Sequence, residues 1–544
     1  MQRRLVPLTL LGLLLLMPAL ARTAEEKAAK SKKPAVILRI APLDKLIADA
    51  HYLVEMAGQA EMAKQLDATI KSKIGDKGLE GIDTKKALGA YGWIGPAGID
   101  SQIVVLAPIA DKKAFLDLLD RLNVKVEEGQ DGLYTASHEK LLVPVYFRFA
   151  NQYVYVTAQD KDALAKDKLL APAVVLPAEE TGAMAMTVNV DQIPENLKEL
   201  ALGNMDNQLA AAKEKQVPKE TELQKKFRTA LIDEVGTRIK SLIKDGGEVK
   251  LNLNVDSKAS NLSLSLSVAG KAGSPLADSI KNLGQTRSLS ASVIGSNSAM
   301  NGVLTVSLPA KLRELLGPVI EEGEKKAVEK EQDKAKREAL SALLKALEPT
   351  LKSAELDVAA DLRGPGDNGR YFAVAAIKVK DGAAVEKTIR QVIGGLPADQ
   401  RKAISFDVEK AGSVSIHRIT PDKTDEQTRQ LFGDNPAVYF AVREDALLVA
   451  LGDKGLGALK EALTAEPKAS KVMEIQMAMS RLAPLMAKDN KSAPEIAKEV
   501  FGKAKDGDKI RITLEGGDAL KLRLGMKAQL LEFFYKTQQS KKGE

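Results

Sequence analysis

The strongest constraint on the fold comes from four segments in which apolar and polar residues alternate. Residues 249–255 and 262–268 alternate on either side of a short turn, and residues 510–514 and 520–526 repeat this arrangement near the end of the chain. A period of two directs all apolar side chains of a strand to one face. Each pair therefore predicts an antiparallel hairpin that packs on one face and meets water on the other.

These hairpins close a longer series of elements that occurs twice in the same order. Each series opens with a strand that ends near a proline and enters a helix with apolar periodicity, at residues 38–47 and 304–316. Proline suits such a helix start, because its φ is already helical and its missing N–H has no partner there. A strand, an aspartate suited to an N-cap and a second helix follow at residues 103–122 and 371–393.

The later parts of the two series also match. Residues 144–161 and 436–454 each predict two strands that end at an Asp-Lys pair and a short helix. A further strand and helix precede each hairpin, at residues 184–202 and 472–486. The repeated order predicts an internal duplication and an α+β fold class with mostly antiparallel β-sheets and packed helices.

We place the two α+β modules at residues 35–290 and 291–535. Within them, residues 207–244 predict two charged helices separated near a proline, and residues 321–352 predict a helix whose leucine stripe packs on the sheet. That stripe is too short for a coiled coil. Residues 536–544 form a polar tail.

Residues 1–21 have the features of a secretory signal peptide. Two arginines precede an apolar run at residues 5–17, and small residues at 19–21 supply a cleavage site. The run is shorter than the about 20 apolar residues of a membrane-spanning helix, although an uncleaved anchor is the alternative. Residues 22–34 predict a flexible Lys/Ala linker. We therefore expect an exported protein, periplasmic or secreted, with no transmembrane segment after signal cleavage.

The composition limits the kinds of chemistry and the classes of partner that we expect. None of the 544 residues is cysteine, which excludes disulfides, thiol catalysis, cysteine-bound zinc and iron–sulfur clusters. The formal net charge is +7, but seven basic and two acidic residues lie within residues 1–34, so that segment carries +5 and the remainder +2. A nearly neutral body lacks the basic surface of a nucleic-acid-binding protein, so no nucleic-acid partner is expected.

No motif assembles a catalytic or metal centre. The three histidines, His51, His138 and His417, lie far apart in the sequence and lack the spacing of zinc ligands. No Gly-x-Ser-x-Gly elbow supports a Ser-His-Asp triad, so we expect the histidines to be structural or exposed. Residues 364–369 have the letters of a dinucleotide-binding loop, but strands are predicted on both sides, which favours a hairpin turn. We therefore assign no catalytic, cofactor-binding or metal-binding residue.

Three weaker features leave alternatives open. Trp93, the only tryptophan, either caps a groove or packs in the core, and core packing is our expectation. Carboxylate pairs are plentiful, and two in a cleft would act on a glycosidic bond, although aromatic residues for sugar stacking are sparse. Methionines cluster in corresponding strand–helix passages, where they either fill the core or form an adaptable lining for an apolar ligand. These are Met184, Met186, Met473, Met477 and Met479.

The whole mature chain resembles a set of exported bacterial proteins that are grouped as a domain of unknown function. The resemblance is carried by the signal peptide, by the strand–helix units at residues 103–122 and 371–393, and by the Asp-Lys strand ends at residues 160–161 and 453–454. These are patterns rather than specific motifs. The resemblance implies export and a fold of sheets with packed helices, and it supplies no catalytic residues.

Duplicated sheets without a catalytic motif favour a non-enzymatic exported protein that binds a protein or envelope component, or that forms part of an envelope structure. The alternative is a periplasmic carrier of a lipid or other apolar molecule, whose structure should contain a large, continuous apolar cavity. A carboxylate-based hydrolase is the third hypothesis, and it requires two close acidic residues in a cleft with a raised pKa. We expect no cofactor.

Overall fold

The computed structural model describes residues 33–544 apart from 75–77, 99, 140, 142, 159, 219, 331–333, 422–423, 435, 467, 503–505 and 544. The predicted signal peptide and residues 22–32 of the predicted linker lie outside the described residues. The chain divides into two compact units. Unit 1 comprises residues 1–204, 242–276 and 527–536, and unit 2 comprises residues 205–241, 277–526 and 537–544.

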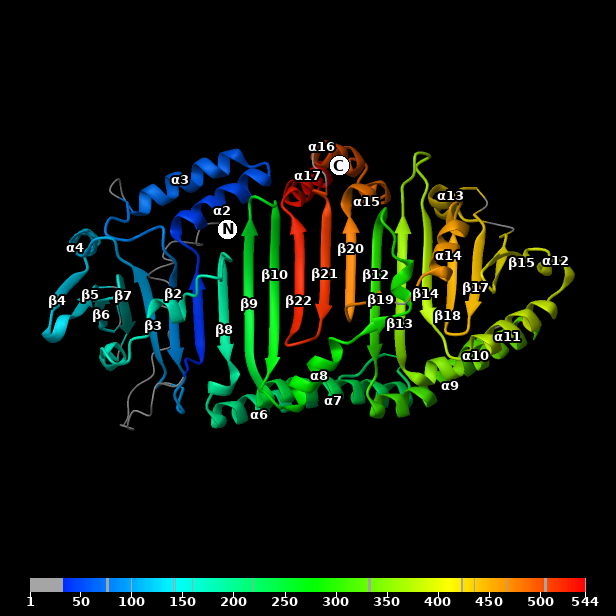
Figure 1. The fold of residues 1–544 in the computed structure, drawn as a ribbon, viewed down its shortest axis with the longest axis horizontal. Coiled ribbons are helices and arrows are strands. Elements are labelled where there is room, and N and C mark those ends of the chain that lie inside the picture. Colours follow the sequence, from blue (N-terminus) through cyan, green and yellow to red (C-terminus); the bar gives the residue numbers. More distant parts are fainter. Residues whose placement is uncertain are drawn as a thin grey trace. The chain divides into compact units, whose positions relative to one another are not determined.

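Unit 1 contains an antiparallel sheet (Figure 1). Its strands follow the order β10–β9–β8–β1–β2–β3–β7–β6–β5–β4. The predicted alternation is present in the hairpin of β9 and β10, where Leu251 lies opposite Leu266 and Leu253 opposite Leu264. The strands are β1 (Val36–Ile40), β2 (Leu88–Trp93), β3 (Gln102–Pro108), β4 (Lys125–Glu128), β5 (Leu133–Ser137), β6 (Val145–Ala150), β7 (Tyr153–Ala158), β8 (Met184–Asn189), β9 (Gly246–Asp256) and β10 (Asn261–Gly270).

Apolar clusters cover both faces of the sheet of unit 1 near β6 and β7. On one face, helix α4 packs Phe115 and Leu119 against a buried cluster around Phe147. On the other face, Tyr155 and Leu164 are the centre of a second cluster. The helices of this unit are α2 (Leu43–Met56), α3 (Ala60–Ile74), α4 (Lys112–Arg121), η1 (Gln130–Gly132), η2 (Lys161–Leu164), α5 (Pro172–Val175) and η3 (Val190–Gln192).

Unit 2 contains an antiparallel sheet whose strands follow the order β22–β21–β20–β12–β13–β14–β18–β17–β16–β15. When the strands of each sheet are numbered in chain order, this spatial order is the same as that of the sheet in unit 1. The strands are β12 (Ser298–Ser307), β13 (Glu355–Arg363), β14 (Phe372–Lys378), β15 (Ile404–Ala411), β16 (Val414–Ile419), β17 (Val438–Arg443), β18 (Ala446–Leu451), β20 (Met473–Ala478), β21 (Lys509–Glu515) and β22 (Leu520–Lys527). The short strands β11 (Arg287–Ser288) and β19 (Lys468–Ala469) pair separately.

Helices cover opposite faces of the sheet in unit 2. Helix α14 packs Leu459 and Leu463 against Leu448 and Ile416 on one face, whereas α11 packs near β17. In Figure 1, α15 and α16 lie at one end of the strands and α9 lies at the other end. The helices of this unit are η4 (Ser290–Val293), α9 (Ala310–Lys330), α10 (Lys334–Ser353), α11 (Gly382–Gly394), α12 (Ala398–Arg401), α13 (Glu426–Phe432), α14 (Gly455–Thr464), α15 (Met479–Met486) and α16 (Ala493–Phe501).

Four further helices contain residues of both units. They are α6 (Glu195–Glu214), α7 (Glu222–Asp245), α8 (Pro275–Leu283) and α17 (Gln529–Gly543). Helices α6 and α7 correspond to the two charged helices expected at residues 207–244, although α6 begins earlier than the prediction. The residues expected as a polar tail continue α17 up to Gly543.

The α+β class with antiparallel sheets is confirmed, and so are both aspartate N-caps. Asp111 accepts a hydrogen bond from the Ala114 N–H at 2.7 Å, and Asp381 accepts one from the Ala384 N–H at 3.0 Å. One packing prediction was wrong: α10 packs mainly against α9 and α11 and not on the sheet. Internal duplication stays a prediction, because a shared strand order is what duplication would produce but does not by itself show it.

Candidate functional site

The register of unit 2 lines up small residues from three neighbouring strands. Gly302 of β12 lies opposite Ala360 of β13, and Ala360 lies opposite Ala375 of β14. The same row continues to Ile475 of β20 on one side and to Val449 of β18 on the other. Successive residues of a strand alternate between faces, so all five residues belong to one face of the sheet.

The rows on both sides consist of larger side chains except at Ala373, and they border a hollow. The bordering rows are Met473–Leu304–Val358–Ile377–Leu447 and Met477–Met300–Leu362–Ala373–Leu451. Glycine and alanine fill little space, so the face is lowest at Gly302, Ala360 and Ala375. A hollow of about 480 Å³ lies there, within the roughly 300–1,000 Å³ of small-molecule sites. We call it the sheet hollow, and these three residues are its floor.

The sheet hollow presents apolar side chains to solvent. Met300 in its lining is 45% exposed, and Ile377 in the bordering row is 38% exposed. The polar residues of the same strands, Asn301 and Asp361, alternate with hollow-facing positions and are buried. Apolar surface that remains exposed in a concave position marks a site for an apolar partner.

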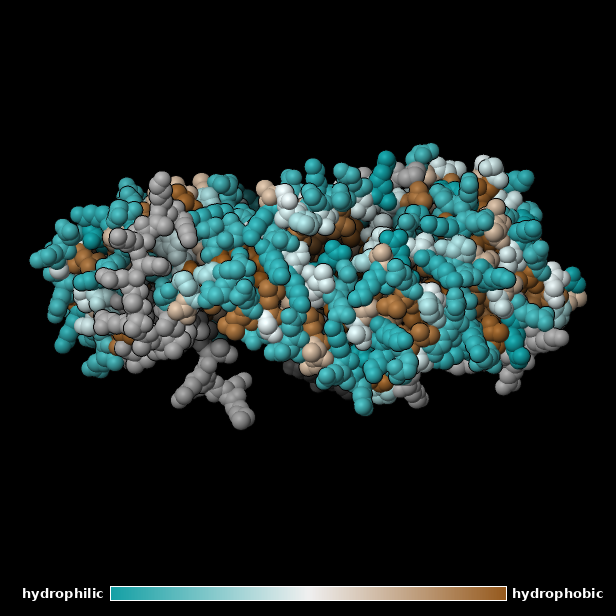
Figure 2. Space-filling model, turned by 90° about the horizontal axis from the view of Figure 1, so that it is seen from below, coloured by the Kyte–Doolittle hydropathy of each residue, from teal (hydrophilic) through white to brown (hydrophobic). Residues whose placement is uncertain are grey.

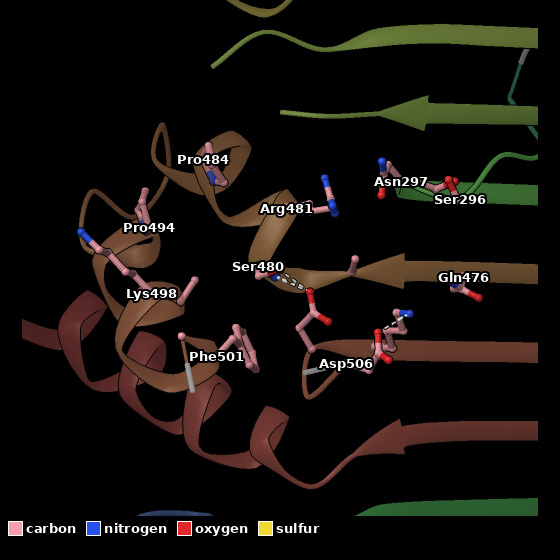
Figure 3. A pocket seen from close by; sticks show the side chains of 16 residues that line it. Ser296, Asn297, Gln476, Ser480, Arg481, Pro484, Pro494, Lys498, Phe501 and Asp506 are labelled. Carbon is pink, nitrogen blue, oxygen red and sulfur yellow. Dashed lines mark hydrogen bonds and ion pairs between the residues drawn. The ribbon is translucent and has the colours of Figure 1, made fainter. Parts of the chain in front are cut away.

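A second cavity in unit 2 is polar (Figure 3). It has a volume of about 410 Å³ and lies between α15, α16 and the ends of β12, β20 and β21. We call it the polar pocket. Its lining includes Ser296, Asn297, Gln476, Ser480, Arg481, Lys498, Asp506, Asp508 and Lys509.

The carboxylates of the polar pocket already have partners. Asp508 accepts hydrogen bonds from the hydroxyl and the backbone N–H of Ser480, which fixes the start of α15. Asp506 forms an ion pair with Lys509 at 2.6 Å. Arg481 donates only to a backbone carbonyl, that of Gly364, at 3.2 Å. Among the described residues, no carboxylate forms an ion pair with Arg481.

A cluster of partly exposed charged side chains surrounds the buried His417 beneath α11. The His417 ring lies between Phe406 and Phe440, with centroid distances of 5.1 and 4.8 Å. Its Nδ1 accepts a hydrogen bond from the Asp407 N–H at 3.1 Å, so the ring proton resides on Nε2. Arg390 binds both Asp407 oxygens, at 2.7 and 2.9 Å.

The electrostatic environment of this cluster favours the neutral form of His417. Burial and the nearby Arg390 lower the pKa of His417, because both oppose a positive charge on the ring. Glu386 lies 3.4 Å from Nε2 and acts in the opposite direction. His417 is fully buried, so no substrate reaches it and the cluster is not assigned as a catalytic site.

The structure does not bring the three histidines together. His51 lies in α2 and contacts Asp67 at 2.8 Å, His138 follows β5, and His417 lies in β16. Among the described residues, no three His, Asp or Glu side chains form a group that could hold a metal ion. Trp93 packs edge-on against Tyr91 at 5.2 Å, as expected of a core residue.

The hydrolase hypothesis gains no support from the carboxylates. Burial, together with Glu348 and Glu321, raises the pKa of Glu324 in α9. Glu324 lines neither the sheet hollow nor the polar pocket. The acids that do line the polar pocket are bound to Ser480 and Lys509. Neither site therefore shows the two poised carboxyl groups that this chemistry requires.

Apolar side chains also reach the surface on α7. Leu231, Val235 and Ile239 are each more than 40% exposed and recur every four residues, which places them on one side of the helix. Figure 2 shows hydrophobic patches separated by hydrophilic side chains on the side seen from below. A convex helix surface encloses no ligand, so we do not assign it as a site. Among the described residues, every helix is too short or too polar to span a bilayer.

Sequence reasoning missed the floor of the sheet hollow. Gly302, Ala360 and Ala375 are far apart in the chain and become neighbours only through strand register. It did single out the methionine cluster to which Met473 belongs, and Met473 lines the hollow. A run of apolar strand residues interrupted by glycine or alanine was the one available signal.

Comparison with known proteins leaves the family open. No protein-family model matches the chain, and no curated protein matches it. A solved structure, crystal form III of TP0453, is similar at 12% sequence identity over 46% of this chain and 83% of that chain. Its TM-score is 0.22, which is too low to support a shared fold or function.

Proposed function

We propose that the protein is exported and binds the hydrocarbon chain of a lipid-like molecule in the sheet hollow. The observation that carries this proposal is an exposed, concave, apolar surface with a floor of Gly302, Ala360 and Ala375. Burying apolar surface stabilises a complex by about 25 cal/mol per Å². The hollow therefore offers binding free energy to an apolar ligand and little to a polar one.

The form of the hollow favours a long, thin ligand. The floor row crosses five strands, from Ile475 on β20 to Val449 on β18. Four spacings between neighbouring strands correspond to about 19 Å. An extended acyl chain fits a trough of this length. The flexible Met300 and Met473 at its border adapt to chains of different shape.

The proposal is tested by titrating the full chain with fluorescently labelled palmitate. We expect Ala360→Leu to weaken binding at least ten-fold, because the larger side chain fills an exposed part of the floor. The matched control is Ala398→Leu, the same change at an exposed position of α12 outside the hollow. Equal affinity of the wild type and Ala360→Leu would contradict the proposal.

Native mass spectrometry of the purified protein gives an independent test. A bound lipid should appear as extra mass that is lost on denaturation, and Ala360→Leu should carry less of it. If the wild type instead captures a protein through this face and excludes palmitate, the sheet hollow is a protein interface and the carrier function is wrong.

Export is the other part of the proposal, and it is supported by the sequence of residues 1–21 alone. N-terminal sequencing of protein recovered outside the cytoplasm should begin after residue 21. Protein that remains in the cytoplasm with its first residues intact would contradict this part without affecting lipid binding.

A further inference from the structure

We propose that the polar pocket of unit 2 binds the phosphate group of a small phosphate ester through Arg481, Asn297 and Ser296. This site is separate from the sheet hollow. Gln476 in its lining and Ile475 in the hollow are neighbours in β20, so their side chains lie on opposite faces of the sheet. The proposal therefore does not depend on lipid binding.

The described lining of the polar pocket carries a formal net positive charge. Asp508 accepts hydrogen bonds from Ser480, which leave its charge in place, and Asp506 is paired with Lys509. Among the described lining residues, three cations nevertheless outnumber these two carboxylates. Two lining cations, Arg481 and Lys498, form no ion pair with a described carboxylate, and the guanidinium of Arg481 donates to the neutral Gly364 carbonyl. A guanidinium has five N–H donors, of which most remain available to an anion here.

The backbone at Arg481 is anchored by hydrogen bonds. Its backbone carbonyl accepts a hydrogen bond of 2.6 Å from the Tyr371 hydroxyl. Burial raises the pKa of Tyr371 to about 12, so the hydroxyl remains a donor at neutral pH. Arg481 also follows Ser480, whose N–H and hydroxyl are held by Asp508. A guanidinium held in place on a fixed backbone loses less entropy when it binds an anion.

The two cations of the pocket without a described ion pair extend in different directions (Figure 3). In Figure 3, Arg481 extends towards Asn297 and Ser296, whereas Lys498 extends to the outer side of α16. Asn297 and Ser296 line the pocket, and neither has a side-chain hydrogen bond to another described residue, so both side chains remain available to a ligand. A phosphate group has three strong acceptor oxygens. The guanidinium can hold two of them in a fork, and the amide and hydroxyl can hold the third.

The test uses the full chain and isothermal titration calorimetry with glycerol 3-phosphate and inorganic phosphate. We expect binding of both, no binding of glycerol, and at least a ten-fold loss for Arg481→Gln. The matched control is Lys498→Gln, which removes the same charge from the same lining and should change affinity less than three-fold. Arg481→Lys should fall between these two, because lysine keeps the charge but lacks the fork.

A second arm distinguishes a soluble ester from a lipid headgroup. Vesicles of phosphatidylcholine with phosphatidic acid are sedimented with the protein and compared with phosphatidylcholine alone. Arg481-dependent binding of glycerol 3-phosphate without vesicle binding identifies a soluble ester, and Arg481-dependent vesicle binding identifies a headgroup. If neither arm depends on Arg481, the proposal is wrong.

Folding of the variants must be separated from binding. Circular dichroism at rising temperature should give the same melting curve for Arg481→Gln and the wild type. If Arg481→Gln does not fold, the double variant Asn297→Ala/Ser296→Ala replaces it, because both residues are exposed and at the pocket wall. That variant should bind glycerol 3-phosphate at least five-fold more weakly, and unchanged affinity would overturn the proposal.

Discussion

The sheets of units 1 and 2 have the same strand order, yet their apolar faces differ at the centre. The row of unit 1 that corresponds to the floor of the sheet hollow is Met186–Leu38–Ala90–Val105–Val156. Its counterpart in unit 2 is Ile475–Gly302–Ala360–Ala375–Val449. Val105 and Ala375 each precede an N-cap aspartate by six residues, which fixes the correspondence along the strands.

Side-chain volume at two positions separates the rows. Leu38 and Val105 fill the surface in unit 1, where unit 2 has Gly302 and Ala375. The pairing of the strands does not depend on this difference in volume, because strand hydrogen bonds do not involve side chains. The comparison shows that one strand arrangement supports either a filled face or a hollow.

A second difference lies beneath the helix on the same face. Tyr134 lies opposite Phe147 in unit 1, and His417 lies opposite Phe440 in unit 2. Helix α4 covers the first pair and α11 lies near the second. Tyrosine remains neutral at physiological pH, whereas histidine changes its protonation there. Unit 2 therefore contains a buried histidine, whose pKa is lowered by burial, at the position where unit 1 contains a tyrosine.

The largest expected effect comes from exchanging the floor residues. Gly302→Leu/Ala375→Val gives unit 2 the residues of unit 1 and should weaken palmitate binding at least ten-fold. A Cβ added at Gly302 would meet its nearest atom, the Glu474 carbonyl oxygen, at 3.7 Å, which is ordinary contact. The change should therefore fill the hollow without disrupting the strand, and fluorescence titration with circular dichroism checks both points.

The reverse exchange tests whether volume alone makes a site. Leu38→Ala/Val105→Ala in unit 1 should cost about 3 kcal/mol of unfolding free energy, because both side chains leave unfilled apolar space. The variant should also gain a second palmitate equivalent in the titration. A stable variant without the extra equivalent would show that unit 1 lacks something other than space.

The next effect is acid sensitivity of unit 2. The pKa of His417 is lowered in the folded state. As the pH falls, the unfolded chain therefore binds a proton at this residue at a higher pH than the folded chain does. This contribution to stability is present above about pH 6.5, the ordinary histidine pKa, and is lost as the pH falls below that value towards the folded-state pKa. Urea unfolding at pH 7.5 and pH 5.5 measures it.

His417→Phe is the matched variant for the acid effect. Phenylalanine retains the contacts with Phe406 and Phe440 but leaves the Asp407 N–H without its acceptor, at a cost of about 1 kcal/mol. The variant should be less stable than the wild type at pH 7.5 and should lose less stability on acidification. The same slope with pH in both proteins would assign the acid response to other groups.

Much of the fold followed from the sequence because its signals are local. The alternation at residues 249–268 and the aspartates at 111 and 381 specify hairpins and helix starts through nearest neighbours. The glycine-rich residues 364–369 form the expected turn between β13 and β14, with the Gly366 N–H donating to the Arg370 carbonyl. The packing of α10 was mispredicted, since a leucine stripe does not reveal whether its partner is a sheet or a helix.

The candidate sites could not be predicted, because they depend on contacts between distant residues. Gly302 and Ala375 are 73 positions apart and share the floor only through the register with Ala360. Asp508 and Ser480 meet across the end of β20, which leaves Arg481 without a carboxylate. Neither arrangement corresponds to a residue spacing that can be recognised in the sequence.

A smaller effect should distinguish the two N-caps. Asp111 has an extended backbone with φ of −144°, whereas Asp381 is left-handed with φ of 57°. Asp111→Ala should cost about 1 kcal/mol for the lost cap. Asp381→Ala should cost about 1 kcal/mol more, because alanine is strained in the left-handed region. Thermal unfolding measures the difference. Asp381→Gly should relieve the backbone strain but should not restore the N-cap hydrogen bond. Equal losses for both alanine variants would show that the strain at residue 381 is relieved by local rearrangement.

The smallest effect is expected from removing the hydroxyl of Tyr134, the residue of unit 1 that corresponds to His417 of unit 2. The Tyr134 hydroxyl donates to the Glu128 carboxylate on the neighbouring strand. Tyr134→Phe loses this bond but retains the stack on Phe147 at 4.9 Å and the Lys112 ammonium 5.0 Å from the ring centre. The cost should be about 0.5–1 kcal/mol, measured by urea unfolding. A loss as large as that of His417→Phe would mean that the polar atom of the buried ring stabilises both units. The two units would then differ only in the pH at which this stabilisation acts.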